Sequence, residues 1–199
     1  MLPTIAEAVL RVLAERRPPV VLALDGRSGV GKSTVAAVLA DRLPATVIPT
    51  DDFFAAEITD AGWHARTAAE RARDCIDWRR MCQCALDPLL AERSAVWHPF
   101  DFAGGPRADG SYAISTQTVR REPAPIIILD GAYSARPELD HVIGLSVLVE
   151  APMAVRAARR AAREHPAFLT AWHERWDAAE DYYFTKVRPR GAFDLVMAG

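Results

Sequence analysis

The sequence predicts an α/β fold with three layers, in which helices cover both faces of a central, mainly parallel sheet. Three apolar runs carry the prediction, because each has the length and composition of a strand buried on both faces: 20–25, 125–130 and 142–150. Helix-compatible stretches between such strands are typical of parallel sheets. At 199 residues, half of them apolar, the chain is expected to form one domain over 1–199, with a last strand near 193–197.

A phosphate-binding motif follows the first apolar run without a gap. The segment 26–33 has the pattern GxxxxGKS, and the stretch from Thr34 to Leu43 suits a helix, so the motif lies between a strand and a helix. In such loops backbone N–H groups and the helix N-terminus hold phosphate oxygens, and the glycines allow an approach that a Cβ would block. A glycine-rich turn without a ligand is the alternative.

The motif predicts ATP and Mg²⁺ as ligands. Lys32 is expected to reach the β- and γ-phosphates and to act in catalysis, and the Ser33 hydroxyl is expected to ligate Mg²⁺. The other loop residues expected to bind the nucleotide are Gly26, Ser28, Gly29, Val30, Gly31 and Thr34. The motif does not identify the group that receives the phosphate.

Carboxylates follow two further predicted strands. The run 45–49 is followed by Asp51 and Asp52, and the central run ends at Asp130. In open α/β sheets ligands bind outside the carboxyl ends of the strands, so the aspartate pair is expected to face the acceptor and Asp130 to serve Mg²⁺. The alternatives are a helix N-cap with a spare acid for the pair, and a strand-end cap for Asp130.

Apolar periodicity predicts the helices outside the phosphate motif. A stripe over 5–13 indicates a first helix, and a stripe over 167–183 indicates a helix packed in the core. A third stripe begins at Asp77 and contains Pro88, so a kink or two short helices are expected there, with Asp87 capping the second.

The stretch 55–120 is expected to be an insertion on the acceptor side. Its first part, 57–74, is polar and poorly periodic, and could be a mobile segment over the acceptor site. The segments 95–102 and 112–119 predict a small antiparallel hairpin around the loop 104–110.

Polar residues in and near this insertion are candidates for binding the acceptor. Asp77 is either a helix N-cap or a ligand for substrate hydroxyls, and the pattern alone favours neither. His98, Asp101 and Arg107 lie near the loop, where a solvated position is as good an interpretation as contact with the acceptor. The full candidate set is Asp52, Phe54, Asp77, His98, Asp101 and Arg107.

A basic helix is predicted to follow Pro152. It carries Arg156, Arg159, Arg160 and Arg163, separated mainly by alanine. A solvated basic face is the ordinary interpretation. Beside a phosphate loop, however, arginines on a closing helix can neutralise the charge that develops in phosphoryl transfer, and we expect that role here.

Composition excludes several classes. The net charge of −2 gives no global attraction to nucleic acid or to a membrane surface, and no apolar run is long enough to span a bilayer. The three cysteines, all between positions 75 and 84, favour a reducing cytoplasm over a disulfide framework. A metal site from Cys82 and Cys84 is a weak alternative, because residues two apart on a helix face different directions.

The motifs together resemble the uridine kinase-like family of phosphate-loop kinases, and the Asp-Asp-Phe-Phe segment most resembles its nicotinamide riboside kinases. The resemblance covers most of the chain and is carried by 26–33, 51–54, 77–78, 129–131 and 156–163. The sequence differs from the family pattern at Asp130, where many members have Glu. It also differs over 97–110, which does not match the nucleobase-binding parts of a uridine kinase.

The resemblance implies roles for single residues. Asp51 would be the base that takes the proton of the acceptor hydroxyl, and Asp77 would hold ribose hydroxyls. A lid over about 156–175 would bring Arg159 and Arg163 to the reacting phosphate and Arg160 to the nucleotide.

The leading hypothesis is therefore an ATP-dependent, cytoplasmic small-molecule kinase, monomeric or homodimeric, that phosphorylates a hydroxyl of a nucleoside or similar riboside. An antibiotic, sugar or vitamin-precursor kinase on the same fold is the first alternative. A nucleotide-binding switch without a small-molecule acceptor is the second.

Overall fold

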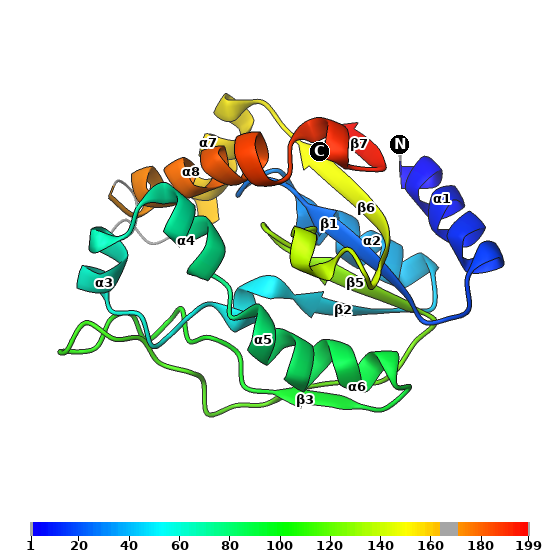
Figure 1. Cartoon of the computed structure of the whole chain (residues 1–199), viewed down its shortest axis with the longest axis horizontal. Coiled ribbons are helices and arrows are strands. Elements are labelled where there is room, and N and C mark those ends of the chain that lie inside the picture. Colours follow the sequence, from blue (N-terminus) through cyan, green and yellow to red (C-terminus); the bar gives the residue numbers. More distant parts are fainter. Residues whose placement is uncertain (1, 164–170, 199) are drawn as a thin grey trace.

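The computed structural model describes residues 2–163 and 171–198 of the chain. Five parallel strands form a central sheet in the order β2-β5-β1-β6-β7 (Figure 1). Their bounds are β1 Val20–Asp25, β2 Ala45–Pro49, β5 Ile126–Asp130, β6 Ile143–Glu150 and β7 Leu195–Ala198. Every residue of β1 and of β5 is buried, which explains why their sequences are continuously apolar up to the final aspartate.

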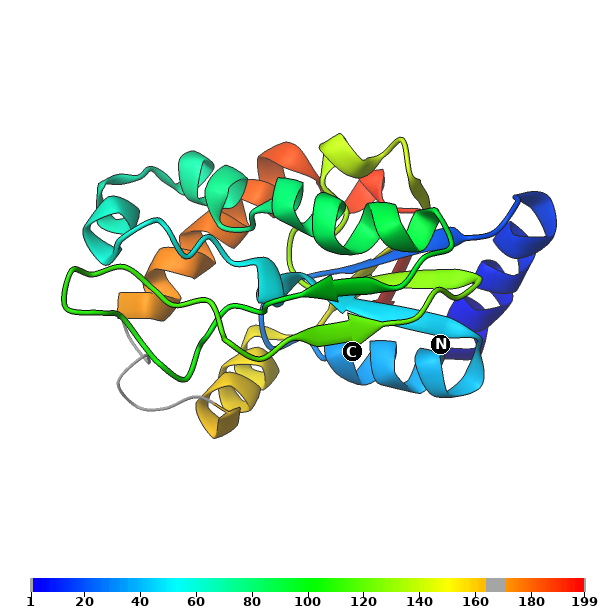
Figure 2. The same ribbon diagram turned by 90° about the horizontal axis from the view of Figure 1, so that it is seen from below.

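Helices cover both faces of this sheet, as predicted (Figure 2). On one face α1 (Leu2–Glu15) and α2 (Lys32–Arg42) bury Ile5, Val9 and Leu39 against β1, β5 and β6. The other face carries α4 (Ala68–Asp74), α5 (Trp78–Met81), α6 (Asp87–Leu90) and α8 (Ala171–Tyr182). The helix α7 (Met153–Arg163) follows β6. The three-layer α/β/α prediction is confirmed.

A two-stranded antiparallel sheet lies beside the main sheet. It pairs β3 (Ala95–Trp97) with β4 (Val119–Arg121), so the predicted hairpin exists, but its second strand begins where the predicted one ended. The Tyr112 N–H donates to the Ala56 carbonyl at 3.2 Å, so the stretch around Tyr112 follows the chain after β2. Apart from one bridge between Phe100 and Ile114, it does not continue the hairpin.

The polar segment 57–74 is more ordered than the sequence predicted. It contains α3 (Asp60–Ala65) and α4, which begin at capping threonines. Thr67 and Glu70 form a capping box, in which each side chain accepts a hydrogen bond from the other residue's backbone N–H. Trp63 is fully buried and anchors the segment on the core. The Thr-x-x-Glu pattern was the sequence signal for this helix.

The helix predicted from Asp77 is interrupted as expected. A π-helical turn, Cys82–Leu86, separates α5 from α6, and Pro88 lies in the first turn of α6. The expected capping role of Asp87 is wrong: Asp87 is the first residue of α6, and Leu86 occupies the N-cap position without a side-chain cap. In the described part of the chain, no helix has the length and apolar character needed to cross a membrane.

Candidate active site

The phosphate-binding motif forms a loop in which three glycines have positive φ angles: 147° at Gly26, 81° at Gly29 and 101° at Gly31. A Cβ on Gly26 would lie 2.3 Å from the Val149 carbonyl oxygen, and one on Gly29 would lie 2.7 Å from that of Arg156. The first and second glycines are therefore required by close backbone contacts with β6 and α7, as well as by their φ angles.

The loop leads directly into α2. Gly31 is the N-cap residue and supplies no side-chain cap, so the first N–H groups of the helix are available to an anion. Lys32 is buried, and its Nζ donates to the carbonyl oxygens of Gly26 at 2.7 Å and Arg27 at 3.1 Å. Ser33 and Thr34 follow on the exposed side of the first turn.

The carboxyl ends of β2 and β5 meet beside this loop. Pro49 of β2 pairs with Asp130 of β5, and Leu24 of β1 pairs with the same aspartate. The contact is so close that a Cβ on Gly131 would lie 1.6 Å from Thr50 Oγ1. The glycine after Asp130 therefore allows the chain before Asp51 to approach the end of β5.

Asp130 has an incomplete set of hydrogen bonds. Burial raises the pKa of its carboxyl group, while a hydrogen bond from Ser33 and the charge of Lys32 oppose that shift. Its Oδ1 is buried and has no hydrogen-bond partner among the described residues. A hydroxyl and an unsatisfied carboxylate oxygen at the mouth of a phosphate loop fit Mg²⁺, which is usually held by one or two protein oxygens together with phosphates and water. The described residues contain no group of three or more His, Cys, Asp or Glu that would suit a closed metal site.

The two aspartates after β2 have different surroundings. Asp51 is exposed and close enough for its charge to raise the pKa of Asp130. Asp52 is half-buried, its Oδ2 accepts a 2.8 Å hydrogen bond from Trp97 Nε1, and burial raises its pKa. The Asp52 side chain is therefore held by β3, whereas the charge of Asp51 acts on Asp130.

A hollow of about 360 Å³ lies between the segment that follows β2 and the start of α5. The structure brings three of the predicted substrate residues, Phe54, Asp77 and Arg107, to its wall. Asp77 also accepts a 3.0 Å hydrogen bond from the Arg80 N–H, so it is both a helix N-cap and a wall residue. The complete lining is Phe54, Ala56, Glu57, Asp77, Arg80, Arg107, Ser111, Tyr112 and Ile114.

Three other predicted substrate residues do not line this hollow: Asp52, which is held by Trp97, and His98 and Asp101. His98 Nδ1 lies 3.0 Å from the Ser115 carbonyl oxygen. Asp101 Oδ1 accepts the N–H groups of Ala103 and Gly104, at 3.1 and 3.0 Å. Both contacts organise the loop beyond β3, and a role for either side chain at the acceptor stays a prediction.

The helix α7 places its arginines against the phosphate loop and α8. Arg159 Nη1 donates to the Val30 carbonyl at 2.9 Å. Arg160 binds both carboxylate oxygens of Asp177, at 2.7 and 3.2 Å. The prediction for the Arg163 side chain lies outside the described side chains.

Sequence reasoning missed three charged residues at this site: Asp25, Arg156 as a contact of the loop, and Glu180. Asp25, fully buried, accepts hydrogen bonds from the backbone N–H groups of Gly26, Tyr133 and Ala135 and from the Tyr183 hydroxyl, at 2.7 to 2.9 Å. Its place at the end of a buried strand was the same signal that identified Asp130. Glu180 lies within a helix and had no such signal.

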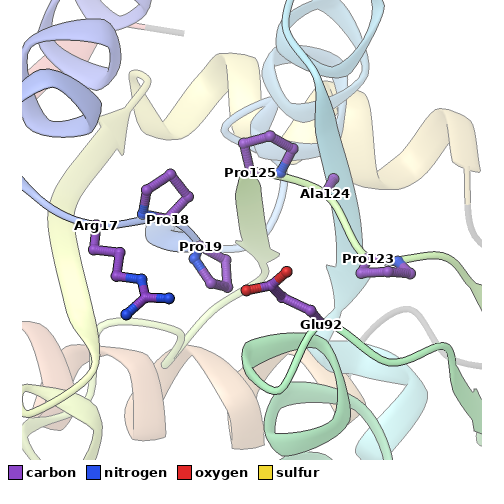
Figure 3. A pocket seen from close by; sticks show the side chains of 7 residues that line it. All are labelled: Arg17, Pro18, Pro19, Glu92, Pro123, Ala124 and Pro125. Carbon is purple, nitrogen blue, oxygen red and sulfur yellow. The ribbon is translucent and has the colours of Figure 1, made fainter.

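A second hollow, of about 380 Å³, lies at the opposite end of the strands, before β1 and β5 (Figure 3). Four prolines form its walls, and Arg17 and Glu92 point toward it from its rim. It lies at the amino ends of the strands, away from the edge where ligands bind in parallel sheets. It therefore takes no part in the candidate active site.

Searches of protein-family models and of curated proteins find no match. Among solved structures, a protein from Silicibacter sp. TM1040 that is provisionally named a fructose transport system kinase is 23% identical, with a TM-score of 0.67 over 99% of this chain and 98% of that one. A provisionally named uridine kinase from Bacillus stearothermophilus is 19% identical, with a TM-score of 0.67 over 98% and 96% of the two chains.

A third similar structure is a provisionally assigned, circularly permuted P-loop kinase from Saccharomyces cerevisiae. It is 12% identical, with a TM-score of 0.55 over 98% of both chains. These likenesses extend over nearly the whole of each chain at low sequence identity. They show that the chain has the three-layer α/β/α fold of phosphate-loop proteins.

Proposed function

We propose that the protein is an ATP-dependent phosphotransferase that moves the γ-phosphate to a hydroxyl group of a small molecule. The observation that carries the proposal is the meeting of three features at one edge of the sheet: the phosphate loop, the acids that follow β2 and β5, and the hollow beyond them. The fold shared with provisionally named small-molecule kinases supports it.

In this proposal the phosphate loop binds the triphosphate. Inward-facing N–H groups of the loop and of the first turn of α2 hold phosphate oxygens, and Lys32 stabilises negative charge on the β- and γ-phosphates. Arg159, whose guanidinium group binds the Val30 carbonyl on the outer side of the loop, is proposed to move to the γ-phosphate when the lid closes and to add positive charge there. Arg160 and Arg163 are proposed to act with it as part of a lid.

Ser33 and Asp130 would hold Mg²⁺, which when bound would neutralise charge on the β- and γ-phosphates. The buried, unsatisfied Oδ1 of Asp130 and its hydrogen bond with Ser33 support this assignment.

Asp51 is proposed as the base that orients and deprotonates the acceptor hydroxyl. It is exposed and electrostatically coupled to Asp130, whereas Asp52 is held by the indole of Trp97. Phosphoryl transfer needs little covalent chemistry from a protein, so positioning of this hydroxyl and charge neutralisation would supply most of the rate enhancement.

The acceptor is proposed to be a nucleoside or similar riboside. The hollow offers the Asp77 carboxylate, which can accept hydrogen bonds from vicinal hydroxyls, beside the apolar surface of Phe54 and Ile114. A sugar, a vitamin precursor or an antibiotic could use the same Asp77 carboxylate, and the acceptor screen below distinguishes these classes.

The decisive experiment measures ADP release with saturating ATP and Mg²⁺ over nucleosides, vitamin precursors, sugars and amino-alcohol antibiotics. We expect one class to raise ADP release far above the baseline with saturation kinetics. Asp51→Asn should reduce kcat by a factor of about 10² to 10⁴ while ATP still binds, and Asp52→Asn is the matched control. The reverse ranking would make Asp52 the base. Stimulation by a protein and by no small molecule would identify a nucleotide-binding switch.

A further inference from the structure

One residue of the phosphate loop is held by an ion pair that joins two helices to it. The Ser28 N–H donates to Glu180 Oε1 of α8 at 2.8 Å, and the Ser28 carbonyl accepts from Arg156 Nε of α7 at 3.0 Å. Arg156 Nη2 donates to Glu180 Oε2 at 3.1 Å and closes the ring. Both backbone polar groups of a single loop residue are thus bound by one Arg–Glu pair, which we call the Ser28 clamp.

The clamp is buried, so both of its charged groups lose the solvation that the members of a surface ion pair keep. Arg156 is 7% exposed and Glu180 3%. Burial raises the pKa of Glu180 and lowers that of Arg156, although each group favours the charged form of the other. Because the desolvation of two charges offsets much of their attraction, such a pair is weak evidence for a stabilising role. What it provides is a fixed geometry.

That geometry determines how the loop faces its ligand. With the N–H and the carbonyl of Ser28 both directed at the clamp, and with Arg159 on the carbonyl of Val30, the outer surface of the loop is bound by groups from α7 and α8. A peptide unit whose carbonyl points outward turns the following N–H to the opposite side. The bonds at Ser28 and Val30 therefore direct the N–H groups of Gly29 and Gly31 toward the inside of the loop.

We propose that Glu180 and Arg156 are positioning residues for nucleotide binding, which hold the phosphate loop in its binding conformation through the backbone of Ser28. The inference rests on the proposed nucleotide-binding function, but not on the identity of the acceptor. Glu180 is also close enough to Lys32 for the lysine to lower its pKa, so loss of its charge would alter the field at the loop as well as its geometry.

The test measures the Kd of a nonhydrolysable ATP analogue with Mg²⁺ by calorimetry, without any acceptor, together with the Tm of each variant. Glu180→Gln keeps the shape and an acceptor oxygen for Ser28 but removes the charge, and we expect a Kd raised about 3- to 10-fold. Glu180→Ala and Arg156→Ala should each raise it about 10- to 100-fold, and Arg156→Lys should recover part of the loss.

The double variant Arg156→Ala with Glu180→Ala should bind no more weakly than the worse single variant, because the two residues act as one unit. The matched control is Glu122→Gln, which removes the charge from another Arg–Glu pair, Arg120 with Glu122, whose side chains are exposed and lie at the end of β4. We expect the control to leave the Kd unchanged.

A wild-type Kd in Glu180→Ala and Arg156→Ala, with only the Tm lowered, would overturn the inference and leave the proposed function intact. Additive losses in the double variant would also contradict it. Binding that depends on the clamp, in a protein that phosphorylates no small molecule, would instead contradict the proposed kinase activity alone. Failure of the wild-type protein to bind the analogue would overturn both.

Discussion

Gly131→Ala tests the close approach between the ends of β2 and β5. The new Cβ would lie 1.6 Å from Thr50 Oγ1 and 2.9 Å from Thr50 Cβ. Thr50 is only 1% exposed, so its Oγ1 has little room to rotate away, and its Cβ, which no rotation moves, would still lie 2.9 Å from the new atom. Relief requires the two strand ends to separate by about 1.4 Å, the distance needed to restore the shortest contact that real Cβ atoms make.

The magnitude follows from two contributions. Overpacking of a buried position costs about 1–3 kcal/mol, and the positive φ of 157° adds about 1 kcal/mol for a residue with a Cβ. The free energy of unfolding should therefore fall by about 2–4 kcal/mol, which for a chain of this length lowers the Tm by about 5–15 °C. A displacement of about 1 Å between Asp51 and the loop should also reduce kcat by about 10²-fold.

The assay is thermal unfolding, followed by ADP release at a temperature where the variant is folded. Gly191→Ala is the matched control, because a Cβ there meets nothing within 4 Å, and it should change stability by less than about 0.5 kcal/mol. Adding Thr50→Gly to Gly131→Ala removes the clashing side chain and should restore part of the lost stability. A Tm of the single variant equal to that of the control would refute the packing argument.

Three further outcomes are expected. Lys32→Ala should lower kcat/KM roughly 30- to 1000-fold, which corresponds to a loss of about 2–4 kcal/mol of transition-state stabilisation, because it removes the positive charge of the lysine. Near-normal turnover would contradict the role of Lys32. Glu70→Ala should lower the Tm slightly through loss of the capping box, with no change in the nucleotide Kd. Trp97→Phe should free the Asp52 carboxylate from the 2.8 Å indole bond. A raised acceptor KM with unchanged ATP affinity would place Asp52 at the acceptor.

The main sheet and the phosphate loop could be predicted because their signals are local. Buried parallel strands are continuously apolar, and the loop is a contiguous pattern whose glycines are required by backbone geometry. The acids after β2 and at the end of β5 followed from a general rule about the carboxyl ends of strands. Each of these inferences needs only neighbouring residues.

The acceptor side and the clamp could not be predicted, because they depend on contacts between distant residues. Glu180 meets Ser28 across 152 positions of sequence, and nothing in the composition of α8 marks it as a loop contact. The second strand of the hairpin was predicted too early because the stretch around Tyr112 is bound to Ala56 rather than to β3. The capping box at Thr67 was visible in the sequence and was the one local signal overlooked there.

Three neighbouring strands end in or near an aspartate. The hydrogen bonds of Asp25 and Asp130 indicate which of the two has a structural role and which could bind a ligand. Asp25 accepts four hydrogen bonds, three of them from backbone N–H groups that can only donate. Asp130 has an unsatisfied buried oxygen among the described residues. Asp25 therefore joins the ends of β1 and β5 and the turn after α8, whereas Asp130 retains an oxygen for a ligand.

The same substitution should consequently have opposite effects on stability at the two positions. Asp25→Asn replaces an acceptor oxygen by an amide NH₂ group, which would face donors. The free energy of unfolding should fall by about 1–3 kcal/mol at neutral pH. Asp130→Asn removes a buried charge whose desolvation outweighs the hydrogen bond from Ser33 and the charge of Lys32. It should raise the Tm by about 2–4 °C for each kcal/mol gained, while impairing Mg²⁺-dependent activity.

The pH dependence at Asp130 follows from its raised pKa. Folding favours the protonated carboxyl group of Asp130. Its burial therefore costs least at a pH below 3.8, the ordinary pKa of an aspartate, and the protein loses stability as the pH rises through the higher pKa of the folded state. The stability gained by Asp130→Asn should therefore appear above that pKa and vanish in acid. Chemical denaturation of wild type and variant at pH 4 and pH 8 measures it, and a gain that is equal at both pH values would show that the buried carboxylate of Asp130 is not the source.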